Sequence, residues 1–240
     1  LMARLQQREI DWNFIFTGQH HETIRDLREN FQIRDPDVIL HQGKDIKSIP
    51  AMLFWIVKIL GTSLWKGRSI FQQDRKGIVL VHGDTFSCLL GALLGKVHGH
   101  KIAHVESGLR SFNLFHPFPE EIVRILTFYL SDIYFCPADW AVENLKKFSG
   151  KKINTHGNTL FDALQEAKQR EAEVEVEIPT EKYAVLSVHR FENIFNEKSL
   201  KLLVQYARMM AKKMKVLFIL HPPTERRLRN SGLLKILEKT

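Results

Sequence analysis

The sequence predicts an α/β protein built around a parallel, doubly wound sheet. Short strands rich in β-branched residues alternate with longer amphipathic segments along the chain, and this alternation is typical of parallel sheets whose faces are covered by helices. Several of the strands run directly into polar or ionisable residues beside glycine. Because a parallel sheet gathers such residues at one edge, they predict a ligand site there.

The alternating pattern places eight strands along the chain. They are expected over residues 13–17, 37–40, 77–82, 101–105, 133–136, 152–155, 183–188 and 216–220. Helices are expected over residues 22–31, 48–64, 85–97, 120–130 and 158–171. Helical segments therefore lie between most of the strands, as parallel strand connections require.

The helix expected over residues 120–130 carries apolar residues at helical spacing. Ile122, Ile125, Leu126 and Tyr129 fall on one face, which predicts that these four side chains belong to the core. Pro119 precedes the helix, at a position that helix starts favour.

An acidic, proline-containing stretch divides the chain. Residues 171–182 read EAEVEVEIPTEK, between a helix and a new strand, and domain boundaries often fall in such stretches. We therefore expect one domain over residues 1–172, a linker over 173–182 and the beginning of a second domain over 183–240. We expect the first domain to lack its opening strand and the second to be incomplete, since its stretch has room for only two strands and two helices.

The charge distribution argues against a nucleic-acid partner. The net charge is +8, but acidic residues stand among the basic ones, and no nucleic-acid-binding motif is present. The densest basic cluster is Arg226, Arg227 and Arg229. It is either the solvated face of a helix, which we favour, or an anion-binding site.

Cysteine usage and hydropathy point to a cytoplasmic protein. Cys88 and Cys136 lack the spacing of a disulfide framework or a zinc site, which predicts a reducing compartment and no bound metal. The longest apolar run, residues 51–60, is too short to span a bilayer. No membrane partner is expected.

Polar side chains follow five of the predicted strands. A single one, such as Asp84, is often only a helix N-cap, but five in register are hard to explain as caps. The residues at these ends are Gln19 and His20, Asp84, Glu106, His189 to Asn193, and His221.

Three carboxylates are expected to lie close together. Asp84 and Glu106 end strands that are consecutive in sequence, and Glu120 begins a helix after the loop at 111–119. Carboxylates that share a site raise one another's pKa, which lets a protein hold a protonated acid near an ionised base. Arg124 lies one helical turn after Glu120; the pair is either a surface salt bridge or has one member facing the ligand cleft.

Five motifs in this chain resemble those of the non-hydrolysing UDP-N-acetylglucosamine 2-epimerases. They are GDT at 83–85, HVESGLR at 104–110, PFPEE at 117–121, GNT at 157–159 and HRFEN at 189–193, and the likeness runs from about Phe16 to His221. The resemblance implies two Rossmann-like domains of the glycosyltransferase-B/epimerase type, with the second incomplete here and the site in the cleft between them. It also implies a UDP-sugar substrate, a homodimer and no cofactor; a GxGxxG motif is absent.

The resemblance also implies roles for individual residues. The essential acids of the family match Asp84, Glu106 and Glu120, and its active-site histidine matches His189. Residues implied in substrate binding are Gln19, His20, Arg124, Arg190, Glu192 and Asn193.

The sequence departs from the family pattern at several points. The GTRPE-like opening loop and the serine-glycine-glycine and double-glutamate element of the uridine pocket are absent, so we expect these 240 residues alone to be inactive. Ser107 replaces a usual alanine, and Phe191 replaces a residue that is commonly charged. Neither change removes Glu106 or His189.

The implied reaction interconverts UDP-N-acetylglucosamine and UDP-N-acetylmannosamine, supplying polysaccharide biosynthesis. Because C2 of the sugar has no adjacent carbonyl, UDP leaves C1 while a base takes the C2 proton, and UDP adds back after a proton arrives on the other face. Two proton-handling groups are needed, and three carboxylates can supply them. Alternatives are a hydrolysing 2-epimerase, a two-Rossmann-domain glycosyltransferase and a non-catalytic binding remnant.

Overall fold

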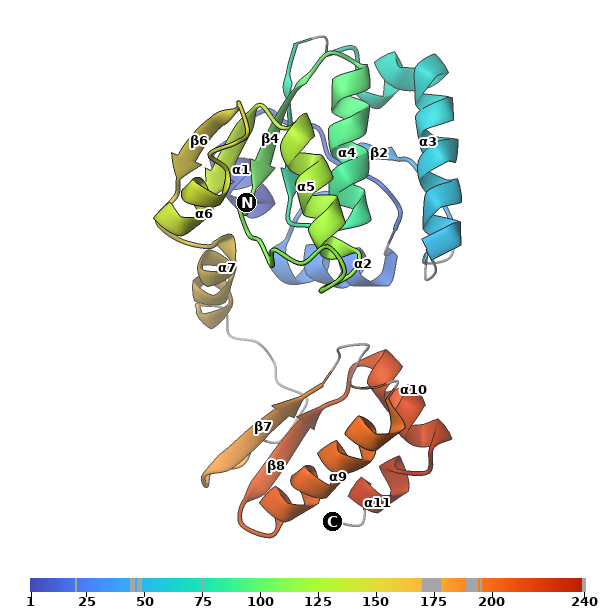
Figure 1. Cartoon of the computed structure of the whole chain (residues 1–240), viewed down its shortest axis with the longest axis vertical. Helices are drawn as coiled ribbons and strands as arrows, with labels where there is room; N and C mark the ends of the chain where they lie inside the picture. Colours follow the sequence, from blue (N-terminus) through green and yellow to red (C-terminus); the bar gives the residue numbers. More distant parts are fainter. Residues whose placement is uncertain are drawn as a thin grey trace. The chain divides into compact units, whose positions relative to one another are not determined.

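The computed structural model describes residues 1–19, 21–43, 46, 49–74, 76–169, 178–188, 194 and 196–238. The chain divides into two compact units, Leu1–Arg170 and Glu171–Thr240, coloured blue to yellow and orange to red in Figure 1. All strand pairs in the described residues are parallel, which confirms the expected α/β architecture.

The main sheet of the first unit has four parallel strands. They are β3 (Ile78–His82), β4 (Lys101–Val105), β5 (Ile133–Cys136) and β6 (Lys151–Asn154), in spatial order β3-β4-β5-β6. Because the strands are parallel, their carboxyl ends lie at one edge, where His82 pairs in register with Val105. A separate two-stranded sheet is formed by β1 (Ile15–Phe16) and β2 (Val38–Ile39).

Helices connect these strands and cover the main sheet. Those of the first unit are α1 (Met2–Gln7), α2 (His21–Phe31), α3 (Ile49–Ile70), α4 (Phe86–Val97), α5 (Glu120–Leu130), α6 (Asp139–Asn144) and α7 (Thr159–Lys168). Helix α4 packs on β3 and β4 and lies between α3 and α5 (Figure 1). None of the helices in the described ranges is long and apolar enough to cross a membrane.

The core of the first unit forms around α4 and α5. Trp55, Ile59, Leu90 and Leu94 form one cluster between α3 and α4. A second cluster between α5, β5 and α6 includes Phe128, Tyr134, Cys136, Ala141 and Leu145. Burial of these side chains supplies most of the driving force that holds α5, and the residues at its start, against the sheet.

Helix α5 buries a different face from the predicted one. Leu126 and Tyr129 are exposed, and Ile122 and Ile125 are only half-buried, so the prediction that these four residues form the core was wrong. The buried residues are Glu121, Val123, Thr127 and Phe128. Both faces of α5 carry apolar residues, and the face that enters the core includes a carboxylate whose charge is balanced by arginines.

The described part of the second unit contains a two-stranded parallel sheet and several helices. Strands β7 (Tyr183–Ser187) and β8 (Lys215–Ile219) pair along their whole length. The helices are α9 (Glu197–Ala211), α10 (Pro222–Asn230) and α11 (Leu234–Glu238). Leu200, Val204 and Leu228 form the centre of its core. In the basic cluster of α10, Arg226 and Arg229 are exposed and Arg229 pairs with Glu225 at 2.8 Å, which favours a solvated face.

Candidate functional site

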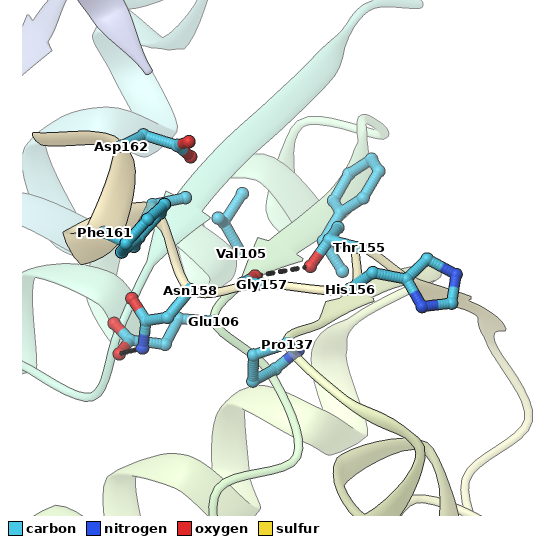
Figure 2. A pocket seen from close by; sticks show the side chains of 11 residues that line it. Val105, Glu106, Pro137, Thr155, His156, Gly157, Asn158, Phe161 and Asp162 are labelled. Atoms are coloured by element: carbon cyan, nitrogen blue, oxygen red, sulfur yellow. Dashed lines mark hydrogen bonds between the residues drawn. The ribbon is translucent and has the colours of Figure 1, made fainter. Parts of the chain in front are cut away.

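A pocket of about 290 Å³ lies at the carboxyl edge of the main sheet. Its lining comes from the segments that follow β4, β5 and β6 and includes Glu106, Pro137, Thr155 and Asn158. Figure 2 shows Asn158 beside Glu106, with His156 pointing away from that carboxylate. The pocket therefore lies where a parallel sheet of this type places its ligand.

Glu106 is held in a defined position in this pocket. Asn158 Nδ2 donates a hydrogen bond of 2.7 Å to Glu106 Oε1. Asn158 Oδ1 accepts from the Leu160 backbone N–H at 2.8 Å, so the start of α7 fixes the amide. The backbone of Glu106 has φ +61°, a left-handed conformation that costs energy outside glycine and clusters at functional sites.

His82, the last residue of β3, also faces Glu106. Its Nε2 lies 3.8 Å from Glu106 Oε2 and 2.8 Å from the hydroxyl of Thr159. Burial lowers the pKa of His82 below its ordinary value, and the negative charge of Glu106 only partly opposes this shift. His82 is therefore mainly neutral near pH 7. Its Nε2 can then donate to or accept from the Thr159 hydroxyl, depending on the tautomer of the ring.

Asp84 is bound by Arg124 of α5. Arg124 Nε and Nη2 both donate to Asp84 Oδ2, at 2.9 and 2.5 Å. The N-cap of α4 is Thr85, whose hydroxyl accepts from the Cys88 backbone N–H, so the capping role considered for Asp84 falls to its neighbour. Arg124 also contacts Glu121, at 3.5 Å.

Glu120 is the first residue of α5 and does not pair with Arg124 in the described ion pairs. The surface salt bridge between these two residues that the spacing allows is thus not formed, because Arg124 turns toward Asp84 and Glu121. The Oε2 atom of Glu120 is buried and has no hydrogen-bond partner among the described residues. A buried carboxylate oxygen without a partner is costly, and an incoming ligand group could satisfy it.

His104 ties together the loops that carry Asp84 and Glu106. Its ring is almost fully buried in β4, and Nε2 lies 2.8 Å from the Gly83 carbonyl oxygen. Burial lowers the pKa of His104 to about 4, so the neutral ring donates to Gly83 through Nε2 and accepts from the Ser107 hydroxyl through Nδ1, at 3.0 Å. Ser107 thus joins a buried hydrogen-bond chain.

Two clusters result at this edge of the sheet. One joins Asp84 to Arg124 and Glu121, and the other joins Glu106 to Asn158 and His82. The two are adjacent because Gly83, between His82 and Asp84, donates its backbone N–H to the Val105 carbonyl oxygen at 3.1 Å.

The remaining predicted site residues fall into two groups. Gln19 is buried, and its Oε1 accepts from the Ser87 hydroxyl at 2.6 Å and from the Ser87 backbone N–H at 3.1 Å, which anchors the start of α4. His20, His189, Arg190, Glu192 and Asn193 lie outside the described residues.

Sequence reasoning missed three residues of these clusters. His82 is the last residue of a predicted strand, whereas the predicted site residues at strand ends all follow their strands. Asn158 lies inside the GNT motif, and Glu121 directly follows Glu120 in PFPEE. Reading every polar residue of each motif as a possible contact would have found the last two.

The fold and these clusters define a class of protein: an α/β protein with a pocket beyond its parallel strands and several carboxylates at the same edge of the sheet. Comparison with known proteins gives the family. A family model described as UDP-N-acetylglucosamine 2-epimerase matches residues 3–239, and the chain belongs to this family.

Three similar proteins show how far the likeness reaches. The UDP-N-acetylglucosamine 2-epimerase of Methanococcus maripaludis is 33% identical over 237 residues, covering 93% of this chain and 62% of the relative. The UDP-2,3-diacetamido-2,3-dideoxy-D-glucuronate 2-epimerase of Pseudomonas aeruginosa is 34% identical over 199 residues, covering 80% and 52%. A crystal structure of Methanocaldococcus jannaschii UDP-GlcNAc 2-epimerase in complex with UDP-GlcNAc and UDP has a TM-score of 0.77 at 28% identity, covering 99% of this chain and 66% of that one. This chain spans less than two thirds of the length of each.

Proposed function

We propose that the gene product containing these 240 residues interconverts UDP-N-acetylglucosamine and UDP-N-acetylmannosamine by eliminating and re-adding UDP. The observation that carries the proposal is the placement of Asp84, Glu106 and Glu120 around one edge of a parallel sheet, in a chain of this family. The names of the curated relatives support the same substrate class.

The carboxylates supply the proton transfers that the reaction needs. Loss of UDP from C1 must be coupled to removal of the C2 proton, and the return of UDP to delivery of a proton on the opposite face, so two groups act on the two faces. Glu106 is oriented by Asn158, Asp84 is ion-paired with Arg124, and Glu120 has an oxygen without a partner among the described residues. Three carboxylates with different partners can therefore supply the two proton-handling groups that the reaction needs.

The substrate-binding residues belong to the same proposal. We assign UDP-sugar binding to Gln19, His20, Arg124, Arg190, Glu192 and Asn193, and a catalytic role to His189. For the residues of the HRFEN motif, the assignment is supported by the resemblance of this motif to that of the family. For Arg190 there is also a chemical reason, because cationic side chains stabilise a departing diphosphate.

The products separate this function from the two main alternatives. Incubated with UDP-N-acetylglucosamine, the gene product should form UDP-N-acetylmannosamine as the main product, with UDP only in traces, measured by ³¹P and ¹H NMR. UDP released in equal amounts with free N-acetylmannosamine would indicate a hydrolysing epimerase. Turnover that requires an added acceptor would indicate a glycosyltransferase. The 2,3-diacetamido glucuronate nucleotide, assayed in parallel, tests the sugar substituents.

We further propose that the protein acts as a homodimer, which the outer face of α3 supports. This face exposes Leu53, Phe54, Val57, Leu64 and Trp65, and Trp65 is 91% exposed. The opposite face is buried through Trp55, Ile56 and Ile59. A helix with large apolar side chains on opposite faces normally buries both faces, and a second copy would cover the outer face of α3. Sedimentation that shows only a monomer at micromolar concentration would contradict this.

We place the reaction in the cytoplasm, in the supply of polysaccharide biosynthesis. Both cysteines are free and buried, and burial raises the pKa of Cys88 to about 12 and of Cys136 to about 11. These thiols suit a reducing compartment. Recovery of the protein from the medium on fractionation would contradict the location, and deletion of the gene without loss of mannosamine-derived polysaccharide would contradict the pathway.

A further inference from the structure

Glu121 is a fully buried carboxylate that the proposed reaction does not use. It is the second residue of α5 and has no exposed surface. Its Oε1 accepts from Arg110 Nε at 2.5 Å, and its Oε2 accepts from the Ser111 backbone N–H at 3.0 Å. Burial alone would raise the pKa of Glu121, but the hydrogen bonds from Ser111 and Arg110 outweigh it and hold the pKa below the ordinary value. The side chain is therefore an ionised, buried anion near pH 7.

The same carboxylate reaches the arginine that binds Asp84. Arg124 Nη1 lies 3.5 Å from Glu121 Oε2, while Nε and Nη2 of the same guanidinium donate to Asp84. The guanidinium is thus held between two carboxylates, and both arginines of the network are largely buried. Because a guanidinium is planar and rigid, anchoring both of its sides fixes its orientation.

The alternating charges connect three separate elements. Arg110 belongs to the loop after β4, Glu121 and Arg124 to α5, and Asp84 to the loop after β3. Glu120 directly precedes Glu121, so these ion pairs also lie next to the proposed catalytic residue Glu120 at the start of α5. Buried ion pairs add little net stability compared with apolar packing, and fixing geometry is a role that such a network can serve.

We propose that Glu121 is a positioning residue that holds Arg124 against Asp84 and thereby sets the geometry of the carboxylate site. This inference rests on the proposed function, because the geometry matters only if Asp84 takes part in the reaction. Glu121 itself acts through Arg124.

A double-mutant cycle on the epimerisation rate tests the proposal. Glu121→Gln should lower kcat/KM by about 10-fold or more, whereas in an Arg124→Gln background the same change should have almost no further effect, since residues of one network are strongly coupled. A loss of equal size in both backgrounds would overturn the proposal. Thr127→Val, at an equally buried polar position of α5, is the matched control and should leave kcat/KM within about twofold. If Glu121→Gln does not fold, Glu121→Asp, which keeps the charge and shortens the reach, takes its place in the cycle.

A second measurement does not depend on activity. In ¹H–¹⁵N spectra of the 240-residue chain, the Arg124 Nε–H signal, assigned by its loss in Arg124→Lys, should exchange slowly with water. Glu121→Gln should speed its exchange by about 10-fold or more, and Thr127→Val should not change it. Unchanged exchange in Glu121→Gln would overturn the positioning role. Faster exchange in a gene product without epimerase activity would instead contradict only the proposed function.

Discussion

Replacing the site carboxylates by their amides should lower kcat for epimerisation by about 10²- to 10⁴-fold for at least two of Asp84→Asn, Glu106→Gln and Glu120→Gln. Each change keeps the shape of the side chain and removes its ability to take or give a proton. A loss of this size corresponds to about 3 to 5 kcal/mol of transition-state stabilisation. The variants should retain the circular dichroism spectrum of the parent protein, because the sheet and its core are untouched.

The three variants should differ in their side effects. Asp84→Asn removes the charge that Arg124 binds, so it should also lower stability, whereas Glu120→Gln changes a carboxylate oxygen that has no described partner. Glu143→Gln, at an exposed carboxylate that pairs with Lys146, is the control and should keep kcat within about twofold. Near-normal kcat in all three site variants would mean that these acids are not catalytic.

Phe128→Ala should lower the free energy of unfolding of the first unit by about 3 to 5 kcal/mol, the usual cost of replacing a buried phenylalanine by alanine. Phe128 is 1% exposed, and the centroid of its ring lies 5.6 Å from that of His104 and 5.4 Å from that of Phe148. Its sequence neighbour Tyr129 is 75% exposed and makes an edge contact with Phe148, so Tyr129→Ala should cost about 1 kcal/mol.

Urea unfolding followed by tryptophan fluorescence measures the free energy of unfolding of the first compact unit, where both substitutions lie. All four tryptophans, Trp12, Trp55, Trp65 and Trp140, belong to the first unit, so the signal reports its unfolding alone. Equal losses of unfolding free energy in Phe128→Ala and Tyr129→Ala would mean that α5 does not bury the face that carries Val123 and Phe128.

The face of α5 shows what the sequence could not predict. Strands β4 and β5 and the bounds of α5 agree with the predicted ranges, because apolar runs flanked by lysine, glycine or proline mark such elements locally. The inward face of α5 depends on partners far along the chain. Hydrophobic spacing favoured Ile122 and Tyr129, whereas the structure buries Glu121 because Arg110 and Ser111 neutralise and bind it. Helix α3 similarly extends to Ile70 rather than residue 64, past Lys66, Gly67 and Arg68.

The candidate site divides in the same way. The parallel topology alone predicts that residues after β3 and β4 lie at one edge, so Asp84 and Glu106 could be named from sequence. Their partners could not, because Arg124 is 40 residues from Asp84 and Asn158 is 52 residues from Glu106. Local spacing pointed to the pair of Glu120 and Arg124, but long-range contacts decided which carboxylate receives the guanidinium.

The central claim, that UDP leaves and returns while the C2 proton exchanges, is tested most directly by running the reaction in D₂O. Mass spectrometry and ¹H NMR of the sugar nucleotides should show deuterium at C2 of the UDP-N-acetylmannosamine product and, more slowly, at C2 of the recovered substrate. The exchange follows because a carboxylic acid that has equilibrated with solvent returns the proton. UDP-N-acetylmannosamine formed in an active reaction with an unlabelled C2 would contradict the account.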